Sequence, residues 1–155
     1  MKAISVFSIL AIAFLFFAMT ALAQDRDTQE INRYVLTEAA FAKYTKATHK
    51  LQPLAGLLSA GDADDEEGFR SLSESVARID AVPEAKAAIH SAGMTTREYV
   101  VFGLSLFQNG VAAWALDQPG GQLPPGVSRA NVDFCKKHEA AIQKLRALTK
   151  GDSDE

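Results

Sequence analysis

Apolar residues recur three and four positions apart along most of the chain, which is the spacing of one face of an α-helix. This pattern predicts a helix over residues 38–59, in which Pro53 should kink the helix or split it in two. A second helix is predicted to carry Phe69 on its apolar face and to stop before Pro83. Pro83 suits the first turn of a short third helix that Gly93 closes.

The most apolar segment of the chain after residue 24 is residues 96–116, and it has no continuous polar face. Thr95 and Glu98 have the spacing of a capping box and mark its start. A helix that is apolar all round should be surrounded by the others, so we expect this one to be the centre of the fold. After a stretch rich in proline and glycine, Ser128 is the expected cap of a last helix over residues 129–149.

The predicted fold class is therefore all-α, a bundle of four main helices plus one short helix around an apolar central helix. No segment shows the sustained alternation of a β-strand, and no internal repeat is visible. Residues 37–150 should form a single helical domain. Residues 24–36 are expected to be a polar arm, mobile over residues 24–33, and residues 151–155 an acidic tail.

Residues 1–23 have the anatomy of a secretory signal peptide. Lys2 is followed by an uncharged, apolar run that ends at Ala21-Leu22-Ala23, a small-x-small cleavage site. An uncleaved membrane anchor is the alternative, since the run is long enough to span a bilayer. We favour cleavage between Ala23 and Gln24, which predicts a periplasmic or secreted protein with no stable membrane span.

Composition excludes some partners and some means of stabilisation. The chain carries 16 basic and 19 acidic residues, so non-specific binding to nucleic acid is not expected. Cys135 is its single cysteine and cannot form an internal disulfide. We interpret Cys135 as a small buried hydrophobe, with a reactive thiol or an intermolecular disulfide as the alternative.

The sequence predicts no metal site and no cofactor. His49, His90 and His138 lack the spacing that places two ligands on one helix face. A Met94–His138 pair is the one arrangement that could hold a haem, because exported helical bundles can bind haem in this way. The acidic loop over residues 61–68 lacks the glycine and the final glutamate that an EF-hand needs.

No catalytic residue can be assigned, so we predict that the protein is not an enzyme. The chain has no Gly-x-Ser-x-Gly motif and no glycine-rich phosphate loop. Nothing near Cys135 or the serines marks an activated nucleophile.

Polar side chains interrupt the central helix at Ser105, Gln108 and Asn109. Because buried amides need hydrogen-bond partners, these residues form either an interhelical lock or the floor of a ligand pocket. We favour the lock and expect Gln108 to be buried and bonded to the last helix near Phe134 or His138. Gly110 should let another backbone approach closely. Ser105, Gln108, Asn109 and His138 are accordingly the candidate ligand-binding residues.

The chain also resembles a group of small secreted all-α proteins from Gram-negative bacteria, which are uncharacterised. The matching segments are Tyr34-Val35-Leu36-Thr37, the stretch from Ala92 to Tyr99 with the apolar helix after it, Leu123-Pro124, Asn131 and Phe134. The resemblance implies export and a helical fold, and it implies no activity.

Three function classes follow from these observations, of which an enzyme with a site assembled across helices is favoured least. The first is an exported, non-enzymatic helical binding or structural module whose partner is a protein, an envelope component or a small apolar ligand. The alternative is a periplasmic helical bundle that binds a metal or haem.

Overall fold

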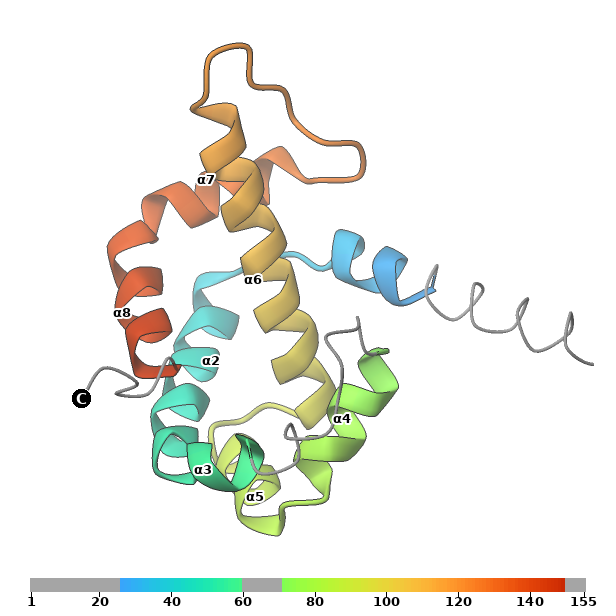
Figure 1. Cartoon of the computed structure of the whole chain (residues 1–155), viewed down its shortest axis with the longest axis vertical. Helices are drawn as coiled ribbons and strands as arrows, with labels where there is room; N and C mark the ends of the chain where they lie inside the picture. Colours follow the sequence, from blue (N-terminus) through green and yellow to red (C-terminus); the bar gives the residue numbers. More distant parts are fainter. Residues whose placement is uncertain (1–25, 60–70, 150–155) are drawn as a thin grey trace, which may run out of the picture.

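The computed structural model describes residues 26–59 and 71–149, and all regular structure within these ranges is helical (Figure 1). The all-α prediction is confirmed. The named helices are α2 (Glu38–Leu51), the 3₁₀ helix η1 (Gln52–Leu54), α3 (Ala55–Ser59), α4 (Leu72–Asp80), α5 (Pro83–Ser91), α6 (Thr96–Leu116), α7 (Arg129–Lys137) and α8 (Glu139–Thr149). The predicted signal peptide, acidic loop and acidic tail lie outside the described residues.

Helix boundaries fall where capping and proline residues predicted them. The Thr37 hydroxyl caps α2 by accepting a hydrogen bond from the backbone N–H of Ala40 at 3.2 Å. Pro53 splits the first long helix, because η1 interrupts it between α2 and α3. Pro83 is the first residue of α5, and Gly93 follows that helix with a φ of 88°. These local signals are therefore confirmed.

Helix α6 occupies the centre of the structure, as predicted, and begins with the expected capping box. The Thr95 hydroxyl accepts from the Glu98 N–H, while the Glu98 carboxylate accepts from the Thr95 N–H at 2.7 Å. Phe102 of α6 is fully buried and contacts the rings of Tyr34 and Phe41. Helices α2, α4, α5 and α7 all contact α6.

The expectation of a mobile polar arm is wrong for residues 26–33, which form a further helix. Its Ile31 is buried together with Leu72 of α4 and Val101 of α6. The Asp27 carboxylate, itself buried, accepts a hydrogen bond from the Leu72 N–H at 2.8 Å. These contacts attach the helix to the body of the fold, which a reading of its polar composition does not reveal.

The predicted last helix is also corrected, because it is divided at His138 into α7 and α8. His138 leaves the helical region with φ −103° and ψ 13°, and the two helices run in different directions (Figure 1). The His138 N–H donates to the Phe134 carbonyl at 3.0 Å at the end of α7, and the His138 carbonyl accepts from the Ile142 N–H at 2.9 Å at the start of α8. Helix α7 packs against α6, while the bend turns α8 toward α2 (Figure 1).

Candidate functional site

One face of α6 is closed by polar contacts to the N-terminal segment. The Ser105 hydroxyl, fully buried, donates to the Ile31 carbonyl at 2.9 Å. The Gln108 side-chain amide donates to the Asn32 side-chain oxygen at 2.6 Å. Both bonds end on residues 26–33, so they hold that helix against α6.

Asn131 of α7 holds the extended segment that follows. Its side-chain oxygen accepts from the Leu36 N–H at 3.0 Å, and its amide nitrogen donates to the Tyr34 carbonyl at 2.8 Å. Asn131 is only 2% exposed, so both backbone groups obtain partners that water could not supply there. The sequence pattern predicted no role for Asn131. The residue was noted only because it matches the group of small secreted proteins that the chain resembles.

The predicted interhelical lock is therefore present at Ser105 and Gln108, but its partner was predicted wrongly. Gln108 bonds Asn32 rather than the last helix near Phe134 or His138, and it is half-buried rather than buried. The reason is that residues 26–33, expected to be mobile, fill this side of α6.

Asn109 is buried and makes a bond within its own helix. Its amide nitrogen donates to the Ser105 carbonyl at 2.7 Å. Its side-chain oxygen has no hydrogen-bond partner among the described residues. Asn109 therefore does not form part of the lock between helices.

The other face of α6 carries three exposed apolar side chains, and this corrects the expectation that the helix is surrounded. Phe107 is 61% exposed, Val111 48% and Trp114 67%. Their spacing of four and three residues aligns them on one stripe. Trp114 is the only tryptophan of the chain. Exposed apolar residues in one continuous stripe mark a binding surface more often than scattered ones do.

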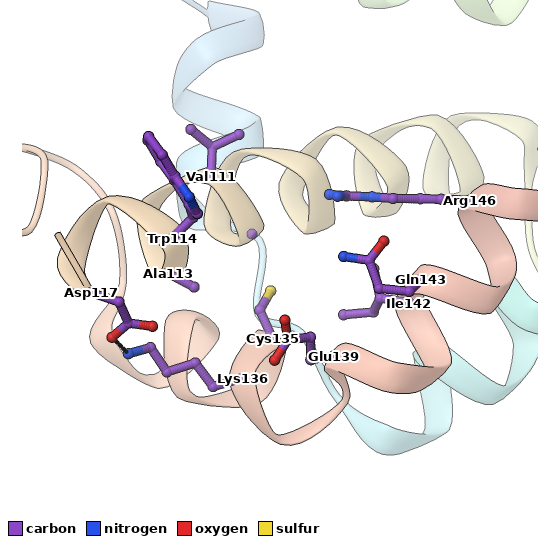
Figure 2. A pocket seen from close by; sticks show the side chains of 11 residues that line it. Val111, Ala113, Trp114, Asp117, Cys135, Lys136, Glu139, Ile142, Gln143 and Arg146 are labelled. Carbon is purple, nitrogen blue, oxygen red and sulfur yellow. Dashed lines mark hydrogen bonds and ion pairs between the residues drawn. The ribbon is translucent and has the colours of Figure 1, made fainter. Parts of the chain in front are cut away.

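A groove of about 320 Å³ lies beside this stripe, between α6 on one side and α7 and α8 on the other (Figure 2). Its floor includes Ala113, Cys135 and Ile142, while Val111 and Trp114 form the α6 rim. Polar side chains from both walls complete the lining: Asp117, Lys136, Glu139, Gln143 and Arg146. A smaller pocket of about 160 Å³ adjoins the groove and shares Ile142 and Arg146 with it.

Arg146 extends from α8 toward α6 at the junction of the two pockets (Figure 2). Its guanidinium carbon lies 5.9 Å from the centroid of the Phe107 ring. A Cβ atom added at Gly110 would lie 3.2 Å from an Arg146 nitrogen, so the glycine makes room for this side chain. The prediction that Gly110 lets another backbone approach is therefore wrong, because the neighbour is a side chain.

The Cys135 thiol, on the floor of the groove, is 3% exposed, which confirms its interpretation as a small buried hydrophobe. Burial raises its pKa to about 11, and the Arg146 charge opposes that rise only in part. A thiol with this pKa remains protonated at neutral pH, so it is a poor nucleophile.

His138 and Met94 occupy separate parts of the fold. His138 lies between α7 and α8, where its Nε2 is 2.9 Å from a Glu38 carboxylate oxygen and its ring contacts that of Phe134. Met94 is buried in the turn that precedes α6. Over residues 26–59 and 71–149, no three His, Cys, Asp or Glu side chains form a group that could hold a metal ion.

Comparison with protein-family models, curated proteins and solved structures found no match to this chain. The resemblance to small secreted proteins stays a prediction.

Proposed function

We propose that the protein is an exported helical binding module and that the groove beside α6, with the Phe107–Val111–Trp114 stripe, is its binding surface. The observation that carries this proposal is the exposure of these three apolar side chains beside a groove with an apolar floor. Two exposed aromatic rings contribute much of a patch on the order of 300 Å², a size that is often functional.

Binding fits this surface better than catalysis does. The Cys135 thiol in the groove is held protonated by its raised pKa. The Asp117 carboxylate pairs with Lys136 at the rim, where the Asp117 side chain is 64% exposed and that of Lys136 38%. The apolar floor and the exposed rim residues suit an apolar or amphiphilic ligand.

Export is part of the same proposal, and the sequence of residues 1–23 supports it. A protein that is cleaved after Ala23 should have Gln24 as its N-terminal residue. Sequencing the N-terminus of the periplasmic or secreted form measures this directly. An intact Met1 species in the membrane fraction would contradict it.

The binding proposal is tested with Nile red, a neutral apolar dye, and a matched pair of variants. Val111→Asp places a charge on the stripe, and Val35→Asp makes the same change at a valine that is 66% exposed elsewhere on the molecule. We expect Nile red to bind the wild-type protein and the Val35→Asp variant, and Val111→Asp to abolish binding while thermal unfolding stays unchanged. Equal dye binding by all three proteins would show that the stripe is not the binding surface.

A further inference from the structure

The charge distribution within the groove narrows the class of ligand, on the assumption that the groove binds one as proposed above. Arg146 brings a permanent positive charge to the junction of the groove and the adjoining pocket. We infer that the groove binds a free single-chain amphiphile with one anionic head group, whose head contacts Arg146 and whose tail lies along the apolar floor.

The charge of Arg146 acts on both sides of this junction. Burial raises the pKa of Cys135, which lines the groove, and that of Tyr44, which lines the smaller pocket. The positive charge of Arg146 opposes this rise in both cases. A positive charge that reaches two buried groups also stabilises an anion placed between them, and a guanidinium suits a carboxylate geometrically.

The size of the groove sets the length of the tail. A volume of about 320 Å³ is at the lower end for small-molecule sites, which suits one chain of about ten carbons better than a two-chain lipid. The floor that the tail would cover includes Ala113, Cys135 and Ile142, and all three are buried residues without an ionised group. Trp114 lines the groove from α6 with its side chain directed away from Cys135 and Ile142 (Figure 2), so its fluorescence would report a tail that lies along this wall.

Two other occupants fit less well. A second copy of this chain would have to cover about 800 Å² per partner, of which the three side chains of the stripe supply only a part. An anionic membrane surface would meet the carboxylates of Asp117 and Glu139 together with Arg146, whereas a single anionic head group would lie only at the Arg146 end of the groove. Both occupants are outcomes of the experiment below.

The experiment compares three probes that share a ten-carbon tail: decanoate, decanol and decylammonium. Binding is measured by the fluorescence of Trp114 at concentrations where the amphiphiles are monomeric. We expect decanoate to bind about tenfold more tightly than decylammonium, because only the anion gains the charge-assisted bond. Octanoate should bind about tenfold more weakly than decanoate, since its tail is two methylenes shorter.

Arg146→Gln is the decisive variant, and Lys144→Gln is its matched control, because it removes one positive charge from the same helix at an exposed position that does not line the groove. Arg146→Gln should abolish the preference for decanoate over decylammonium, measured as the ratio of their two dissociation constants. Lys144→Gln should keep the preference in full. Circular dichroism of both variants confirms that the helices are intact.

Each remaining outcome separates this inference from the proposed function. If decanol and decanoate bind equally well, the groove is a binding site but the anionic preference is wrong. If none of the three probes binds, both proposals fail. Binding only to vesicles of anionic phospholipid would assign the surface to a membrane. A dimer in light scattering that Val111→Asp dissociates would assign it to a second copy.

Discussion

The two faces of α6 differ in what their side chains contact. On one face, Ser105 and Gln108 donate hydrogen bonds to Ile31 and Asn32, so the polar groups find partners within the chain. On the other face, the Phe107–Val111–Trp114 stripe stays largely exposed. Only 39% of the most apolar 18-residue window of α6 is buried, a low share for the central helix of a fold.

This difference separates stability from binding. Buried hydrogen-bonded groups cost folding free energy when a partner is removed, because a desolvated polar atom is left alone. Exposed apolar side chains contribute little to folding and gain free energy only when a ligand covers them. Changes on the closed face should therefore lower stability, and changes on the open face should lower binding.

The largest effect is expected for Asn131→Ala, which removes both bonds to the segment that leads from the closed face to α2. The Leu36 N–H and the Tyr34 carbonyl would lose their partners in a site that is 2% exposed. We expect a loss of about 3 kcal/mol in the free energy of unfolding, measured by urea titration. Asp133→Ala, on the same helix and 58% exposed at its side chain, serves as the control and should change stability little. Equal losses in both variants would contradict the role of Asn131.

Substitution of Gln108 should have an intermediate effect on stability, and two variants at this position separate a loss of stability from a loss of binding. Gln108→Ala should cost about 1 kcal/mol of unfolding free energy, because the bond to Asn32 is lost at a half-buried site. Gln108→Leu should recover part of that loss by filling the volume. Neither change should alter the binding of Nile red or decanoate. Reduced binding with unchanged stability would move Gln108 to the ligand site.

The smallest effect on stability is expected for Trp114→Ala, although it removes the largest side chain considered. Because Trp114 is 67% exposed, the free energy of unfolding should change by less than about 0.5 kcal/mol. Dye binding should fall sharply in the same variant. A loss of stability as large as that of Asn131→Ala would mean that the open face is part of the folded core.

Local signals made much of the fold predictable from sequence. Thr37 and Thr95 are caps with a known hydrogen-bond geometry, and Pro53 cannot continue a helix, so these boundaries follow from one or two residues. The bend at His138 has no such signal, because no proline or glycine stands there.

The missed features depend on contacts between distant segments. Asp27 and Asn32 look like solvated polar residues in the sequence, yet the first binds the Leu72 N–H and the second receives the Gln108 amide. The apolar pattern of α6 likewise does not distinguish Phe107, which is exposed, from Phe102, which is buried. Of the candidate site residues, Ser105 and Gln108 hold the N-terminal helix against α6 and do not line the groove. The sequence pattern did not predict the groove.

Acrylamide quenching of Trp114 fluorescence in the purified native protein tests most directly that α6 keeps an open face. Trp114 is the single tryptophan, so the signal comes from the stripe alone. We predict a quenching constant close to that of the urea-unfolded protein and independent of protein concentration. Strong protection of Trp114 in the native state, without added ligand, would show that this face is covered and would contradict the account.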